Sequence, residues 1–321
     1  MAEARNHHYV PQAYLRNFAD GIGRKARLFT ADLVDGRSFT TLVRNVAALR
    51  DFNRIVSDEH DPNAVEEAYA RFEDEAAGAL RRVLATESLA HKGDLRIILN
   101  LMALLVVRHP RIRNKIRDLM ADVGQAMLEA STATKDRWRH ATAEVKGVPL
   151  DQVEISDSDY QAMRSFVLEK RYDLKLHQNV HVSLEIETHD PVLKMLLARK
   201  WTLHIADNGN DLITSDNPSF LLPLKPQSGP FGLGYGSPDG AAIFPLSPRL
   251  LMTGVFDGPE GSVRLSKNAV AQMNTEIARH AERQAFAHDT AFEYAVGGQL
   301  HQGPALASDE RFRKKASKLF T

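Results

Sequence analysis

The stretch LRIILNLMALLVV, residues 95–107, is the most hydrophobic part of this 321-residue chain. A membrane-crossing helix needs roughly 20 apolar residues, whereas this run is shorter and is interrupted by Arg96 and Asn100. We therefore predict a helix buried in a protein core. Pro110 should end or kink it, because proline lacks the backbone N–H and clashes with the preceding turn. The chain opens without an apolar run of signal-peptide length, so we expect a cytoplasmic protein with no membrane partner.

Helical patterns lie on both sides of this core helix. Asp61 and Pro62 suit the start of a helix whose apolar residues recur at steps of three and four to about Thr86. Asp94 is the expected N-cap of the core helix itself. Further helices are predicted at 111–127, 133–146, 158–172, 191–200 and 267–284.

Hairpin patterns occupy the ends of the chain. Asp35-Gly36 lies at the centre of an alternating segment, 26–41, and supplies the backbone conformation of a tight turn. A second hairpin is expected between 201–205 and 211–215, and Asp190-Pro191 is expected to begin the helix before it. Further strands are predicted at 241–246, 250–256 and 285–296.

The order of these patterns predicts an α+β protein, with a mainly helical N-terminal two-thirds and a C-terminal third rich in antiparallel β-hairpins. We expect a first lobe over 1–200, a β-rich lobe with one helix over 201–300, and a basic, mobile tail over 301–321. One continuous domain is the alternative.

The composition excludes several classes of protein. There is no cysteine, which excludes disulfides, zinc ribbons, iron–sulfur clusters and thiol nucleophiles, so any metal site must use His, Asp and Glu. Basic and acidic residues number 41 each, so the overall charge does not draw the chain to nucleic acid or to an anionic membrane. The absence of a phosphate loop, a GxSxG elbow, an HExxH motif and a Rossmann glycine pattern disfavours ATPases, α/β-hydrolases and dinucleotide enzymes.

Two N-terminal features could carry chemistry. His7 and His8 are adjacent, so in an extended segment one could bind a metal while the other supports it; two surface histidines are the alternative. Glu66 and Glu73 lie almost two helical turns apart on one line and could hold a hard cation. A solvated helix face explains the same spacing.

Two later segments are also candidates. Arginines 108, 111 and 113 cluster where one helix ends and could bind a phosphate or carboxylate, or simply complement a helix dipole. Past the expected strand at 211–215 comes a rigid polar turn, in which Asp216 could coordinate a metal or orient a histidine. Ordinary turn chemistry before a proline is the alternative.

These segments, in this order, resemble a widespread and functionally uncharacterised bacterial family, DUF4238. The resemblance rests on a sequence like HHYVPQxYLRNF at 7–18, a helical glutamate at Glu73 and an Arg-x-Pro segment at 108–110. It also rests on a Trp-initiated hairpin at 201–214, SDNP at 215–218 and PLSP at 245–248. It spans about residues 7–285 and leaves the tail outside. It implies that the segments form one site and brings no established activity.

If the segments converge, imidazole and carboxylate side chains would form a metal site, with ligands drawn from His7, His8, Glu66, Glu73 and Asp216. Such ligands suit a divalent cation, with Mg²⁺ or Mn²⁺ expected rather than Zn²⁺. The cation would activate water, and the expected catalytic residues are His8, Arg108 and Asp216. The expected substrate-binding residues are Arg108, Arg111, Arg113, Ser215 and Asn217.

This site predicts a metal-dependent phosphodiesterase or nuclease, with nucleic acid as its partner, in a role such as a toxin or phage-defence effector. The alternative is a non-catalytic binding or regulatory protein, in which the same His, Asp and Arg side chains form a structural polar network. A third hypothesis is an enzyme on a small molecule, with the Gly- and Pro-rich segment 223–240 as a lid. The sequence does not determine the oligomeric state.

Overall fold

The computed structural model describes residues 6–53, 64–174, 176–207, 211–226 and 232–315. The chain divides into two compact units. The main unit takes the residues up to Arg111 and from Val182 onward, and the inserted unit is Ile112–His181. This division differs from the boundaries at 200 and 300 that were expected from the change in sequence pattern.

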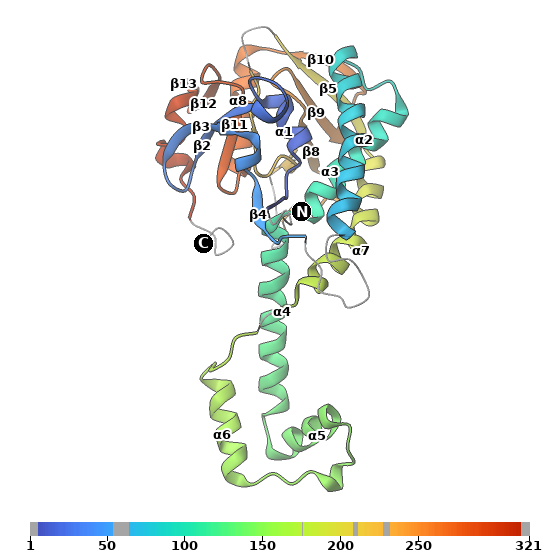
Figure 1. Cartoon of the computed structure of the whole chain (residues 1–321), viewed down its shortest axis with the longest axis vertical. Helices are drawn as coiled ribbons and strands as arrows, with labels where there is room; N and C mark the ends of the chain where they lie inside the picture. The colour runs from blue at the N-terminus through green and yellow to red at the C-terminus, as the bar shows by residue number, and fades with distance from the viewer. Residues whose placement is uncertain (1–5, 54–63, 175, 208–210, 227–231, 316–321) are drawn as a thin grey trace. The chain divides into compact units, whose positions relative to one another are not determined.

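The described part of the chain begins with short strands and α1, continues through the consecutive helices α2 to α7, and ends in strands interrupted by α8 (Figure 1). The helices are α1 (Gln12–Leu15), α2 (Ala64–Thr86), α3 (Lys92–Val107), α4 (Pro110–Ser131), α5 (Lys135–Lys146), α6 (Asp157–Leu168), α7 (Gln178–Leu197) and α8 (Lys267–His280). The strands are β1 (Asn6–His8), β2 (Arg27–Asp32), β3 (Arg37–Leu42), β4 (Ala48–Arg50), β5 (Lys200–Ala206), β6 (Thr214–Ser215), β7 (Phe220–Pro223), β8 (Gly240–Pro245), β9 (Leu250–Val255), β10 (Gly261–Leu265), β11 (Gln284–Ala287), β12 (Glu293–Val296) and β13 (Gln299–Gln302).

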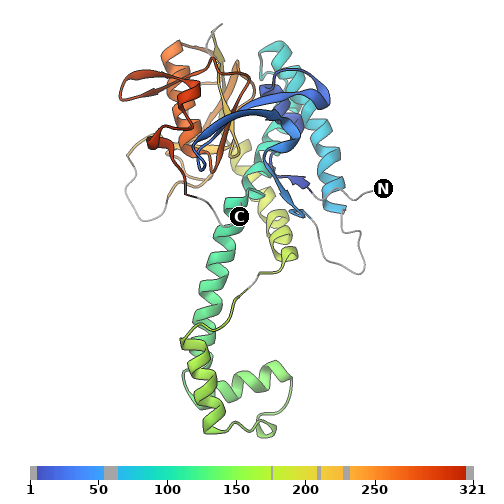
Figure 2. The ribbon, with the colours of Figure 1, turned by 60° about the vertical axis from the view of Figure 1, so that its left-hand side comes forward.

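Two sheets organise the main unit. One has the strand order β10-β5-β9-β8-β7 and is antiparallel except for the parallel pair β10 and β5. The other has the order β3-β2-β11-β6 and is antiparallel throughout. Strands from both ends of the chain therefore share the second sheet, as the neighbouring blue and orange strands show (Figure 1 and Figure 2). The mixed content agrees with the predicted α+β class, but the predicted order of helices first and hairpins last is not confirmed.

Strand β8 of the five-stranded sheet is buried on both faces. In β8, Ala242 and Phe244 join one core cluster, and Ala241 and Ile243 join the other. This alternation follows from the two-residue period of a strand. The first cluster also contains the core helix α3, whose predicted burial is confirmed.

The two predicted hairpins have different outcomes. The hairpin at 26–41 is confirmed, since β2 pairs with β3 and Gly36 adopts a φ of 71° in the turn. The predicted pairing of 201–205 with 211–215 is wrong. Strand β5 pairs with β9 and β10, whereas β6 pairs with β11 in the other sheet. Turn-like residues between two strands did not decide their partners, because both strands pair with segments that lie far away in the sequence.

The helix boundaries agree with the sequence at the two breaks around α3. Helix α2 ends at Thr86 as predicted, and α3 ends before Pro110, which begins α4. The N-cap is a correction: His91 caps α3 by accepting a hydrogen bond from the Asp94 backbone N–H. The carboxylate of Asp94 instead accepts hydrogen bonds from Arg82. The predicted start at 61–62 lies outside the described residues.

Two later helices differ from prediction. Helix α7 begins at Gln178 and runs through Pro191, so this proline does not start a helix. Val192 and Leu193 pack against the first core cluster beyond the proline, and this packing offsets the lost backbone hydrogen bond. Helix α8 ends at His280, earlier than predicted, because the following backbone N–H groups bind a side chain from another segment.

The described part of the basic tail, residues 301–315, packs against the main unit. Phe312 is 2% exposed within the second core cluster, and the backbone N–H of Lys314 donates to the Leu33 carbonyl at 2.9 Å. These contacts hold this segment in place, unlike the mobile tail expected from its charge.

Among the described residues, no helix is long and apolar enough to cross a membrane.

Candidate functional site

The N-terminal histidines lie in the short strand β1, which pairs with β4. Their side chains leave the strand on opposite faces, so His7 is 2% exposed and His8 is half-buried. The Nδ1 atom of His7 accepts a hydrogen bond from the Asn53 backbone N–H at 2.8 Å. The Nδ1 atom of His8 lies 3.5 Å from the Gln12 amide. His7 therefore anchors the chain segment that follows β4.

Arg108 joins three of the sequence motifs. Its side chain is fully buried at the end of α3, where Nη2 donates to Glu73 Oε1 at 3.0 Å and Nε donates to the Tyr9 carbonyl at 3.3 Å. The guanidinium also lies over the ring of Tyr69, 4.8 Å from the ring centroid. Arg108, predicted to bind substrate, and Glu73, predicted to bind a metal, thus meet as an ion pair with each other.

His109 is held in its neutral form by two hydrogen bonds. Its Nδ1 accepts from the Arg111 backbone N–H at 3.1 Å, so the ring proton lies on Nε2 and is donated to the Asp216 carbonyl at 3.0 Å. A proton added to Nδ1 of His109 would point at the backbone N–H of Arg111, so two donors would face each other without an acceptor. Burial also lowers the pKa of His109 to about 4.

The low pKa of His109 predicts a loss of stability in mild acid. The unfolded chain takes up a proton near pH 6.5 and the folded chain only near pH 4, so the stabilising contribution is complete above pH 6.5 and is lost as the pH falls between these values. His109→Gln keeps a side-chain donor for the Asp216 carbonyl but does not titrate. We expect the wild type to lose about 3 kcal/mol more than this variant between pH 6.5 and pH 4. Urea unfolding across this pH range measures the difference, and parallel curves would contradict the assignment.

Asp216 has both carboxylate oxygens occupied by the protein backbone. Oδ1 accepts from the N–H of Glu282 at 2.8 Å, and Oδ2 accepts from those of Arg283 at 2.8 Å and Gln284 at 3.0 Å. Burial raises the pKa of Asp216 to about 7, against the opposite effect of these three donors. The carboxylate thereby fixes the chain between α8 and β11 at the end of β6.

The residues next to Asp216 also make contacts within the protein near the junction of α8 and β11. Ser215 Oγ accepts from the Asn217 backbone N–H at 3.1 Å, and the Asn217 amide donates to the His280 carbonyl at 2.8 Å. Arg111 forms an ion pair with Glu282 at 3.3 Å. These three predicted substrate-binding residues all have protein partners in the main unit.

The structure brings together most of the predicted site residues, with two exceptions. Arg113 belongs to the inserted unit, and the side chain of Glu66 lies outside what is described. Among the described residues, no three or more His, Asp or Glu side chains form a group that could hold a metal ion. The divalent metal remains a prediction.

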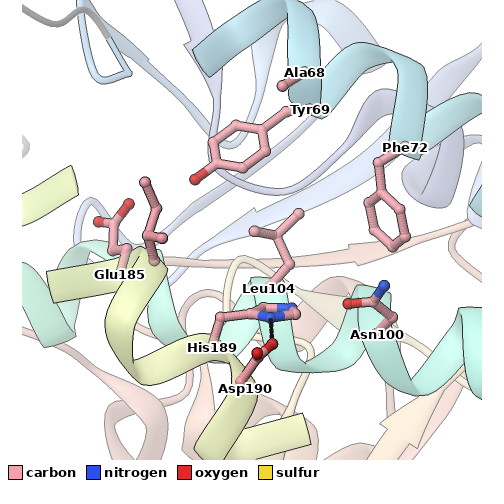
Figure 3. A pocket seen from close by; sticks show the side chains of 9 residues that line it. Ala68, Tyr69, Phe72, Asn100, Leu104, Glu185, His189 and Asp190 are labelled. Atoms are coloured by element: carbon pink, nitrogen blue, oxygen red, sulfur yellow. Dashed lines mark hydrogen bonds and ion pairs between the residues drawn. The ribbon is translucent and has the colours of Figure 1, made fainter. Parts of the chain in front are cut away.

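A pocket of about 350 Å³ lies next to this network, between α2, α3 and α7 (Figure 3). Tyr69 and Phe72 line it from α2, on the helix that also carries Glu73. The remaining lining residues are Ala68, Asn100, Leu104, Glu185, Ile186, His189 and Asp190. The volume falls in the range of small-molecule sites.

Two carboxylates, those of Glu185 and Asp190, line the pocket. Glu185 is 3% exposed, and Asp190 Oδ1 lies 3.3 Å from Nδ1 of His189. No lysine or arginine is among the lining residues described for this pocket. The pocket residues Glu185 and His189 were missed from the sequence, although their four-residue spacing on one helical face was a usable signal. The sequence analysis placed a helix start at Asp190-Pro191, so the residues before Asp190 were not assigned to that helix and this spacing was not recognised.

Comparison with known proteins gives one match. No curated protein and no solved structure matches this chain. A sequence profile of DUF4238, described as a protein of unknown function, matches residues 6–291, which contain all the motif segments of the polar network. Since this match extends over most of its length, the chain belongs to the DUF4238 family.

Proposed function

We propose that this chain is a non-catalytic binding protein, in which the motif residues form a structural polar network and the neighbouring pocket binds a small organic cation with an apolar body. The network part rests on Arg108, His109 and Asp216, whose hydrogen-bonding atoms described above are directed at protein groups. Buried polar groups arranged in this way stabilise one fold and do not need a substrate.

The ligand class follows from the charge of the pocket, which is the observation that carries the proposal. Its polar lining includes the carboxylates of Glu185 and Asp190 and the imidazole of His189, with no lysine or arginine among the described lining residues. Arg108 lies over the Tyr69 ring but is not among the lining residues, and its charge is paired with Glu73. Tyr69 and Phe72 offer aromatic surface, which attracts a cation and covers an apolar body.

We expect 3-phenylpropylamine to bind more tightly than 3-phenylpropanol, which has the same shape and no charge. Glu185→Gln should weaken amine binding about tenfold, because it removes a buried opposite charge. Isothermal titration calorimetry with both probes measures this difference. Glu187→Gln is the matched control, because Glu187 is an exposed carboxylate on the same helix and outside the pocket lining. Equal binding of the two probes, or binding of neither, would contradict the proposed ligand class.

The metal-dependent nuclease is the competing prediction, and a separate titration distinguishes it. Mn²⁺ titrated into chelator-stripped protein should give no binding heat if the motif residues are purely structural. Uptake of one or two ions that Glu73→Ala abolishes would favour the nuclease and make nuclease assays the next step.

A further inference from the structure

Helix α4 has one face covered within the inserted unit. A Cβ atom at Gly124 would lie 2.9 Å from Leu174, and the Gln125 side chain bonds the hydroxyl of Tyr172. Arg164 of α6 donates to the Glu129 carbonyl at 3.1 Å. These contacts place the segment after α6, and α6 itself, along one side of α4.

The opposite side of α4 is apolar and exposed. Leu119, Val123 and Met127 lie at steps of four residues and are 59%, 46% and 67% exposed. Met120 beside them is 43% exposed. The full row alternates steps of four and three, which is the spacing of a coiled-coil seam, through Ile112, Ile116, Leu119, Val123, Ala126 and Ala130. Ile112 and Ile116 at its start are half-buried, and the other four are exposed.

We propose that this row, the α4 seam, packs against the same seam of a second copy of the chain in antiparallel orientation. A C2 pair of identical helices buries both rows at once, as a self-complementary interface requires. A helix of 22 residues extends about 33 Å, which is long enough for three seam layers on either side of the two-fold axis.

The charges beside the seam favour the antiparallel orientation. Lys115, Asp122 and Glu129 follow one flank at seven-residue intervals. In an antiparallel pair centred near Asp122, Lys115 of each copy faces Glu129 of the other, giving two opposite-charge contacts at the cost of one Asp122 pair. In a parallel pair, Lys115 and Asp122 would instead face Met120 and Met127 of the other copy, which carry no charge.

The first test measures association of the full chain by sedimentation velocity between about 1 and 200 µM, a range that covers weak interfaces. The wild type is expected to dimerise, and Leu119→Glu should raise the dissociation constant about a hundredfold or more, because it buries a charge in both copies. Leu168→Glu is the matched control, since Leu168 is 53% exposed on α6, outside the seam. A wild-type monomer throughout, or equal weakening by the control, would overturn the proposal.

A charge exchange tests the orientation. Lys115→Glu and Glu129→Lys should each weaken the dimer about tenfold, and the double variant should restore it. Asp122→Asn should tighten it, because it removes the one like-charge contact at the centre. Circular dichroism verifies that each variant keeps its helices. Failure of the double variant to restore association would exclude the antiparallel pair.

Discussion

Asp216→Asn is expected to lower the free energy of unfolding of the main unit by about 3–5 kcal/mol, because each buried donor left without an acceptor costs about 1–3 kcal/mol. Asparagine has nearly the shape of aspartate, so the variant leaves no cavity. Its oxygen can still accept from Glu282, but its NH₂ group would face the N–H groups of Arg283 and Gln284. For a unit of this size the loss corresponds to a decrease in Tm of about 10 °C.

Differential scanning calorimetry measures this effect on the full chain. Asp257→Ala is the control, because the Asp257 side chain is fully exposed and its ion pair with Lys200 is long, at 3.5 Å. A wild-type Tm for Asp216→Asn, together with loss of Mn²⁺ binding, would contradict the structural role and favour the metal site.

Arg108→Met is expected to cost about 2–4 kcal/mol of unfolding free energy, since removing one partner of a buried ion pair leaves the other charge uncompensated. Methionine retains most of the buried volume but donates no hydrogen bond to Glu73 or to the Tyr9 carbonyl. The cost stays below that of a fully buried pair, because the Glu73 side chain is 22% exposed and can gain water.

A double-mutant cycle with Glu73→Gln isolates the pair. The double variant should be more stable than the sum of the single effects predicts, by about 1 kcal/mol or more. The matched control is Arg279→Met, which breaks the exposed pair of Arg279 with Glu276 and should leave stability unchanged. Additive single effects would mean that Arg108 and Glu73 do not stabilise each other.

The sequence identified much of the polar network but not its chemistry. Adjacent histidines, a helical glutamate, Arg108 at a helix end and Asp216 after a strand were all visible as polar residues at special positions. Their convergence was expected from the family resemblance. The three N–H groups that bind Asp216 come from residues 282–284, more than sixty positions later, and no local pattern connects them. An aspartate that binds a metal and an aspartate that accepts hydrogen bonds from backbone N–H groups cannot be distinguished in a sequence.

The pocket was not predictable for a related reason. It needs the consecutive helices α2 and α3 together with α7, which comes much later in the chain, and its residues are ordinary members of helices. Only Glu185 and His189 had a recognisable spacing, and the nearby proline obscured it. The apolar periodicity of the α4 seam was visible in the sequence, but periodicity alone could not show that the protein core leaves much of this seam exposed.

Local chemistry alone determined the burial of α3, the break at Pro110, the hairpin turn at Gly36 and the membership of a family with these motifs. These features depend on periodicity, on proline and glycine backbone preferences, and on residues close in the chain. The tertiary structure decided which strands pair with β5 and β6, that α7 continues through Pro191, and that Asp216 binds backbone N–H groups. Each of these outcomes depends on the burial and hydrogen bonding of distant segments, which exist only once the chain has folded.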